Sequence, residues 1–133
     1  MRLERVHHMG VIVPDLHAAI GGFRDVLGLE LDHTEPYGEE LQIAFLPCGE
    51  VLVELIQPLT ERGFSADWLT ANGPGIQHVA FEVRDLEAAL RELADKSVRP
   101  TGEAPRAGAG GTIIAFLDPE PFGGVIVELV QPA

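Results

Sequence analysis

Cysteine, aromatic residues and long apolar runs are all scarce in this sequence. Its 133 residues include one cysteine, Cys48, and 6% aromatic residues. One cysteine cannot close an internal disulfide, which excludes a disulfide scaffold and fits a reducing compartment. No window approaches the roughly 20 apolar residues of a membrane helix, and the N-terminus lacks the pattern of a signal peptide. We therefore expect a cytoplasmic protein with no membrane partner.

Basic residues are also few, with nine Lys and Arg against 21 Asp and Glu and a formal net charge of −12. The basic residues are scattered singly, so the clustered positive charge that binds nucleic acid is absent. A small anionic substrate would then depend on specific local groups, of which Arg106 is the candidate. The glycine-rich stretch 107–111 lacks the lysine and serine of a P-loop and does not open a helix, so we expect no nucleotide cofactor there.

The most informative feature is a repeated hexapeptide. Val53–Pro58 recurs as Val127–Pro132 with five of six residues identical, and each copy contains a glutamate, Glu54 or Glu128. A carboxylate in an apolar, β-branched run is costly to bury unless it is paired or coordinates something. Because the same misfit occurs twice, we expect the two glutamates to converge.

A second repeat precedes each hexapeptide. The segment from His8 to Leu16 aligns with the segment from His78 to Leu86 at a shift of 70 residues. Apolar residues at i, i+3, i+4 and i+7 then follow in both copies and predict a helix. Asp15 and Asp85 stand where N-caps belong.

The rest of each copy predicts strands, so each module is βαβββ. In the first copy we expect Gly28 to end the helix and strands to follow at 29–35, 41–46 and 51–57. In the second copy we expect a strand at 76–83 and a helix from Leu86 to about Lys96. A short strand near Val98 and strands at 112–117 and 125–130 should follow. Between the copies, 60–74 predicts a linker with one short helix capped by Ser65, and 102–111 and 118–124 predict long irregular loops. The prediction is a single α+β domain over 1–133 with modules at about 1–59 and 74–133.

Four polar residues recur at matched places: His8 and His78 near the start of a first strand, Glu54 and Glu128 within a last strand. An approximate twofold relation between the modules would bring all four to one site. Two imidazoles and two carboxylates suit a divalent ion such as Co, Mn, Ni, Zn or Fe. The other three histidines are not predicted as ligands. His7 should point to the strand face opposite to that of His8, His17 lies on the predicted helix, and His33 lies in a strand without a repeat partner.

These motifs resemble the vicinal oxygen chelate superfamily, which includes glyoxalase I, extradiol dioxygenases, fosfomycin-resistance proteins and methylmalonyl-CoA epimerases. The resemblance covers nearly all 133 residues and is greatest to the epimerases, through the segments His8–Val13 with Asp15-Leu16, Val53–Pro58, Trp68-Leu69 with Gly73–Phe81, Glu103–Arg106 and Gly123–Leu129. It implies an open, incompletely closed barrel of two modules around a metal site, with the same four ligands. It also implies a homodimer.

The resemblance further implies an epimerase or isomerase that polarises a carbonyl on the metal and moves an α proton through a carboxylate. Glu128 is the first candidate for this base, Glu54 the second, and the small-molecule substrate is expected to be an acyl-CoA. Several bacterial epimerases carry a further glutamate base on the second strand, where this sequence has Ile43. The family's His-Pro-Lys is Asp118-Pro119-Glu120 here. The alternatives are a glyoxalase-like isomerase or lyase, a specialised-metabolism enzyme on the same scaffold, and a non-catalytic binding protein of the resistance type.

Overall fold

The computed structural model describes residues 1–133 and divides them into two compact units. One unit is His8–Gln77, and the other is formed by Met1–His7 together with His78–Ala133. The α+β class predicted from the sequence is confirmed. No helix of the chain has the length and apolar character that crossing a membrane requires.

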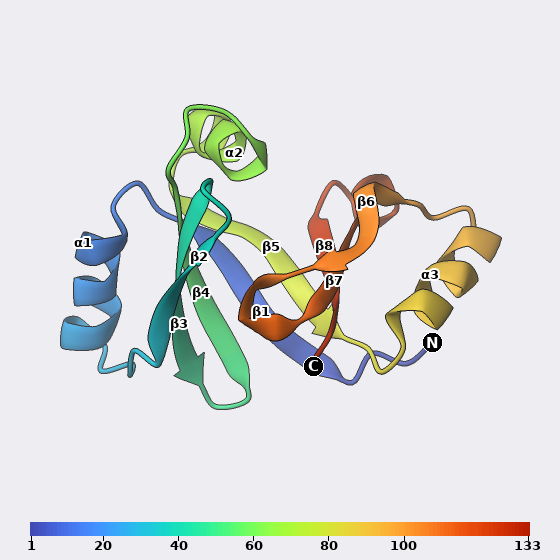
Figure 1. Cartoon of the computed structure of the whole chain (residues 1–133), viewed down its shortest axis with the longest axis horizontal. Coiled ribbons are helices and arrows are strands. Elements are labelled where there is room, and N and C mark those ends of the chain that lie inside the picture. The colour runs from blue at the N-terminus through green and yellow to red at the C-terminus, as the bar shows by residue number, and fades with distance from the viewer. The chain divides into compact units, whose positions relative to one another are not determined.

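The first unit contains a four-stranded sheet with a helix on one side (Figure 1). Its elements are β1 (Arg5–Ile12, of which the part from His8 lies in this unit), α1 (Leu16–Gly21), the π-helical turn η1 (Gly22–Val26), β2 (His33–Tyr37), β3 (Leu41–Cys48), β4 (Val51–Pro58) and α2 (Phe64–Asn72). The strand order is β2-β3-β4-β1. The β2–β3 and β3–β4 pairs are antiparallel, whereas β4 and β1 are parallel.

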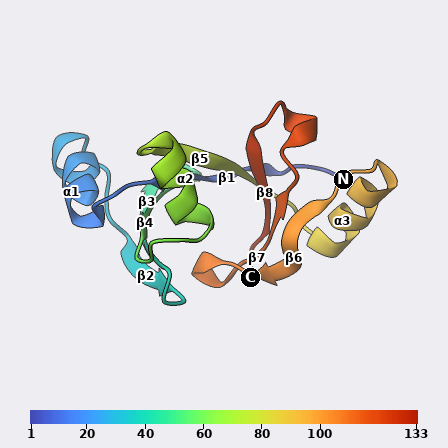
Figure 2. The same ribbon diagram turned by 90° about the horizontal axis from the view of Figure 1, so that it is seen from above.

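The second unit repeats this plan, with α3 alongside β6 (Figure 2). Its elements are β5 (Gly75–Glu82, of which the part from His78 lies in this unit), α3 (Leu86–Asp95), β6 (Pro100–Ala107), the 3-10 turn η2 (Ala109–Gly111), β7 (Ile113–Leu117), the 3-10 turn η3 (Glu120–Phe122) and β8 (Ile126–Gln131). The order is β5-β8-β7-β6, with β5 and β8 parallel and the other pairs antiparallel. Each unit therefore has one parallel pair between its first and last strands.

The helix starts follow the predicted capping. The Asp15 carboxylate accepts a hydrogen bond from the Ala18 N–H at 3.1 Å, and Asp85 accepts from the Ala88 N–H at 3.0 Å. Both aspartates have extended backbone angles, as N-cap residues do. Gly28 adopts φ 80°, the left-handed conformation expected at the end of the first helical segment.

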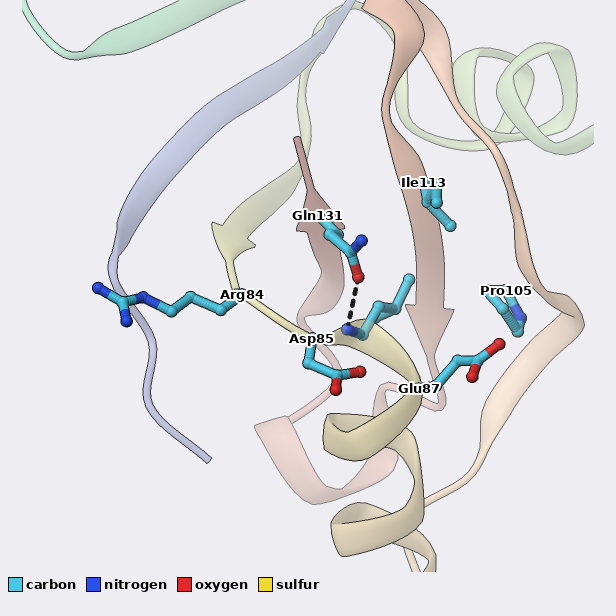
Figure 3. Close-up of a pocket in the computed structure, with 7 residues that line it drawn as sticks. Arg84, Asp85, Glu87, Pro105, Ile113 and Gln131 are labelled. Atoms are coloured by element: carbon cyan, nitrogen blue, oxygen red, sulfur yellow. Dashed lines mark hydrogen bonds between the residues drawn. The ribbon is translucent and has the colours of Figure 1, made fainter. Parts of the chain in front are cut away.

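The glutamine of the repeated hexapeptide ties each helix to the last strand of its module. Gln57 Oε1 accepts from the Leu16 N–H at 2.8 Å, and Gln131 Oε1 accepts from the Leu86 N–H at 2.9 Å (Figure 3). A first-turn N–H has no partner within its own helix, so a side-chain acceptor satisfies it. The conspicuous glutamine of the repeat is thus explained by helix docking.

The helix of each unit covers one face of its sheet and leaves the other face for the site. In the first unit, Leu16 and Ile20 of α1 pack with a set of alternate strand residues: Ala44, Leu46, Val53 and Leu55. In the second, Leu86, Ala89 and Leu93 of α3 pack with the equivalent set: Ala115, Leu117, Val127 and Leu129. Because side chains alternate along a strand, residues of the other parity point to the face away from the helix. Glu54 and Glu128 belong to that parity.

Three local predictions were wrong. The strand expected near Val98 is β6 at Pro100–Ala107, most of which lies in the segment 102–111 that was predicted to be a loop. It pairs only with β7 and shifts register between Thr101 and Arg106, and such an edge position tolerates prolines that a central strand would exclude.

The second and third errors concern the first unit and the linker. The strand expected at 29–35 is β2 at His33–Tyr37, because Leu29 and Leu31 pack into the α1 core instead. Ser65 does not cap α2. The helix begins at Phe64 with Gly63 at its N-cap, in a φ of 125° that favours glycine, and Ser65 is buried within the helix.

Candidate metal centre

The first unit brings His8 and Glu54 together in its interior. Their Nδ1 and Oε2 atoms are 3.2 Å apart, and each residue is only 5% exposed. The parallel register of β1 and β4 sets Gly10 opposite Glu54, two residues beyond His8 and on the same face. Since Gly10 has no side chain, the imidazole and the carboxylate can meet above it.

The second unit repeats this arrangement. His78 Nε2 and Glu128 Oε2 are 3.6 Å apart, and both residues are 4% exposed. Ala80 lies opposite Glu128 in the parallel register of β5 and β8, which matches the register of β1 and β4. The sequence repeat therefore places the same two side chains above the same kind of small residue in each module.

A phenylalanine flanks each glutamate from the third strand. Phe45 lies opposite Glu54 in β3–β4, and Phe116 lies opposite Glu128 in β7–β8; both rings are buried. The His78 ring meets the Phe116 ring edge to face, with centroids 5.1 Å apart. These rings exclude water and lower the local dielectric, which strengthens every interaction of a charge placed there.

Burial shifts the pKa of one group in each His–Glu pair. Desolvation, together with a smaller effect of the nearby Glu35 carboxylate, raises the pKa of Glu54 to about 8. Desolvation lowers the pKa of His78 to about 4. At neutral pH the folded protein thus favours a protonated Glu54 and a neutral His78 in the absence of a cation. A divalent cation would stabilise the ionised carboxylate, and the neutral imidazole is the form that binds metals.

The donor chemistry and spacing of both pairs fit a metal ion. Two donors about 2.1 Å from one ion, separated by roughly 90–110°, lie about 3.0–3.4 Å apart. The two His–Glu separations, 3.2 and 3.6 Å, are close to that range. These buried His and Glu groups could hold a metal ion.

The three histidines outside the predicted ligand set differ in their exposure and contacts. His17 is exposed on α1. His7 is buried, and burial lowers its pKa. Burial therefore does not distinguish His7 from the predicted ligand His8. That His7 is not a ligand stays a prediction. His33 is half exposed and stacks on Phe45, with ring centroids 4.5 Å apart and an interplanar angle of 5°.

Sequence reasoning gave no role to His33 and did not consider Glu35, because neither residue has a counterpart in the repeat. His33 Nδ1 lies 2.6 Å from Asp32 Oδ2, and its Nε2 lies 3.3 Å from Glu35 Oε1. Both residues belong to β2, whose position was predicted too early in the chain. A correct strand register would have put them beside Phe45 and Ile43.

Arg106, the candidate for binding an anion, lies over the Phe116 ring at 5.5 Å from its centroid. Its Nη1 donates to the Glu103 carbonyl at 3.3 Å. The guanidinium therefore packs on the ring that flanks Glu128.

A separate cleft of about 360 Å³ opens beside the start of α3 (Figure 3). It is lined by Arg84, Asp85, Leu86, Glu87, Pro105, Ile113 and Gln131. Three of its polar groups already have structural partners: Asp85 caps α3, Gln131 accepts from Leu86, and Arg84 Nε lies 3.1 Å from Glu4. None of the four predicted ligands lines this cleft.

Comparisons with known proteins agree with the sequence motifs. The family model of the Glyoxalase/Bleomycin resistance protein/Dioxygenase superfamily matches residues 7–116. The ethylmalonyl-CoA/methylmalonyl-CoA epimerase of Cereibacter sphaeroides is 35% identical over 97% of this chain and 98% of its own. The crystal structure of methylmalonyl-CoA epimerase from Mycobacterium tuberculosis has a TM-score of 0.92 and 37% identity, covering 98% of this chain and 89% of that one.

A third relative has been solved with a ligand. A variant of Streptomyces coelicolor methylmalonyl-CoA epimerase, in complex with 2-nitronate-propionyl-CoA, has a TM-score of 0.92 and 33% identity and covers 99% of both chains. The predicted resemblance is therefore confirmed over the full length of the chain.

Proposed function

Because this chain belongs to the Glyoxalase/Bleomycin resistance protein/Dioxygenase superfamily, we propose that it is a divalent-metal-dependent epimerase acting on methylmalonyl-CoA or a closely related acyl-CoA. The observation that carries the proposal is the full-length similarity to methylmalonyl-CoA epimerases, combined with a buried His–Glu pair in each module. The binding-protein alternative is disfavoured because all four predicted ligands are retained.

The proposed ligands of a single ion are His8, Glu54, His78 and Glu128. The support is chemical: a His–Glu pair alone is an incomplete donor set, whereas two imidazoles and two carboxylates leave room for substrate oxygens in the shell of one ion. The modules also supply these donors from the same strand register. Co, Mn, Ni, Zn and Fe all suit this set.

The bound ion would supply a positive charge that stabilises negative charge developing on a substrate carbonyl oxygen. The chain's own groups would move the proton. We assign removal of the C2 proton to the Glu128 carboxylate, with Glu54 as the second candidate. Burial among phenylalanine rings would keep water away from the acidified carbon. For the second candidate, Glu54, the raised pKa of about 8 suits proton exchange near neutral pH.

The direct test is exchange at C2. The protein, stripped of metal and then reloaded with Co²⁺, is incubated with racemic methylmalonyl-CoA in deuterated water, and the C2 signal is followed by NMR. We expect deuterium incorporation that depends on the metal. No exchange above the metal-free control would overturn the proposal, and isomerisation of a glutathione hemithioacetal by the same preparation would favour the glyoxalase-like alternative.

The cytoplasmic location and the homodimer stay predictions. Light scattering of the purified protein tests the dimer, since a mass equal to one chain at micromolar concentration would contradict it.

A further inference from the structure

The proposed epimerisation needs a proton-transferring group on each face of C2, and Glu128 accounts for one. Ile43, which matches the position of a glutamate base in several bacterial epimerases, is 3% exposed and has no ionisable atom. The second group must come from elsewhere. This inference rests on the proposed function above.

The strand register leads from Ile43 to a carboxylate on the next strand. Glu35 of β2 lies directly opposite Ile43 of β3. Residues directly opposite in an antiparallel pair point to the same face of the sheet. Phe45 is two residues beyond Ile43 and lies opposite Glu54, so Glu35 shares a face with the proposed ligand Glu54. This is the face away from α1.

Side-chain contacts hold Glu35 at that face. Its side chain is 31% exposed, and Oε1 lies 3.3 Å from His33 Nε2. The His33 ring is fixed in turn by stacking on Phe45 at 4.5 Å. Glu35 on β2 and Glu54 on β4 are separated by β3 alone, and both lie on the same face of the sheet. A carboxylate that is reachable from solvent and close to Glu54 has the placement a second base requires.

We propose that Glu35 is the second base of the epimerisation and serves, from β2, the face of C2 opposite to Glu128. In one direction the Glu35 carboxylate removes the C2 proton and becomes a carboxylic acid, while Glu128 in its acid form delivers a proton to the other face of the enolate. In the reverse direction the two residues exchange roles. One proton leaves C2 and one arrives, so the step needs no further reactant.

His33 is the other ionisable group beside Phe45, but it is suited to positioning. Both of its ring nitrogens face carboxylates, Nδ1 towards Asp32 and Nε2 towards Glu35. The hydrogen bond with Asp32 is the main cause that raises the pKa of His33, so the ring tends to keep its proton. The His33 ring, held between the Asp32 and Glu35 carboxylates, orients Glu35.

The test is Glu35→Gln, which keeps the size of the side chain and an acceptor for His33. The matched control is Glu39→Gln, an exposed glutamate in the turn after β2. Each epimer of methylmalonyl-CoA is supplied separately in deuterated water, and exchange and inversion at C2 are followed. We expect epimerisation to fall by about 100-fold or more, the usual contribution of a general base. One epimer should still exchange C2 with retention, and metal content should not change.

A second variant keeps the proposal falsifiable. Adding Ile43→Glu to Glu35→Gln moves the carboxylate one strand along the same face, and we expect epimerisation to recover at least about tenfold over Glu35→Gln. If the buried glutamate prevents folding, Glu35→Asp replaces it, and we expect an activity between Glu35→Gln and the unmodified protein.

The outcomes separate the two proposals. Undiminished epimerisation in Glu35→Gln would overturn the role of Glu35 and leave the proposed function intact. Loss of C2 exchange from both epimers, with the metal retained, would also overturn a base that serves one face. Absence of exchange in the unmodified protein would overturn the proposed function itself.

Discussion

Gln57 Oε1 accepts a hydrogen bond from the Leu16 N–H at 2.8 Å and so fastens the start of α1 to the end of β4. Gln131 makes the equivalent bond to Leu86 at 2.9 Å. The repeated hexapeptide therefore has two functions within six residues. Its glutamate faces the site, and its glutamine, three residues later and on the opposite face, holds the helix that covers the core.

Replacing Gln57 with Leu should destabilise the protein by about 1 kcal/mol, because a partly buried helix N–H loses its acceptor. Gln131→Leu should cost a similar amount. Gln57→Glu is the matched control, since it keeps an acceptor and adds a charge that the helix N-terminus favours. Urea unfolding measures all three, and equal stability of the Leu and Glu variants would contradict this role of the glutamine.

Removing the metal should make stability depend on pH between about 6.5 and 8. Burial raises the pKa of Glu54 from 4.5 to about 8, so the metal-free folded state loses stability as the pH rises through that interval. His78, lowered from 6.5 to about 4, acts oppositely, but only below its unfolded value of 6.5. Between 4.5 and 6.5 the two contributions should roughly cancel. Above 6.5 the loss from Glu54 should remain, and His33, whose pKa is also raised, should add a loss of the same sign.

A divalent ion removes the cause of this loss, because it stabilises the ionised Glu54. The rise in melting temperature on adding Co²⁺ should therefore grow from pH 6.5 to pH 8. Thermal unfolding with EDTA and with saturating Co²⁺ across this pH range measures the rise in melting temperature. In Glu54→Gln the pH dependence of the metal-free protein should flatten. A metal-free protein whose melting temperature is constant from pH 6.5 to 8 would show that Glu54 is already ionised.

The four-ligand proposal predicts one ion per chain and a loss of that ion from a change in either module. His8→Ala and His78→Ala should each weaken binding by more than about 100-fold, because even residues that only support a ligand contribute about 10–100-fold. Isothermal titration with Co²⁺ measures stoichiometry and affinity together. Two ions per chain, with one surviving unchanged in His8→Ala, would mean that the pairs act separately.

The repeat made much of this site predictable. The two glutamates are misfits in apolar strands that occur twice, the two histidines recur at matched places, and the structure buries them as the pairs His8–Glu54 and His78–Glu128. The N-caps and the covered faces also followed from local patterns, since capping and alternation act within a few residues.

What could not be predicted depends on strand pairing and on a local change of helix type, neither of which the apolar periodicity encodes. β6 forms because it pairs with β7 at the edge of the sheet. Its own prolines and glycine are typical of a loop. The π-helical turn η1 has no signal in the apolar periodicity. Glu35 has no repeat partner, and its place beside Ile43 is set by the register of β2, which short-range patterns do not determine.

The small residue opposite each glutamate allows a prediction in which each module serves as the experimental control for the other. Gly10 faces Glu54 and Ala80 faces Glu128 in the same register, so the second module shows that one methyl group is compatible with this geometry. Gly10→Ala should therefore leave Co²⁺ affinity near that of the unmodified protein. Gly10→Val should lower it by at least about tenfold and cost about 1–3 kcal/mol of stability, since extra methyl groups in a packed interior force neighbours out of place.

Ala80→Val should behave like Gly10→Val, because the Ala80 side chain is fully buried against Ile114, Phe116 and Val130. Titration calorimetry and urea unfolding check both effects. A Gly10→Val protein that binds Co²⁺ with unchanged affinity would show that the imidazole and the carboxylate do not need the space above position 10.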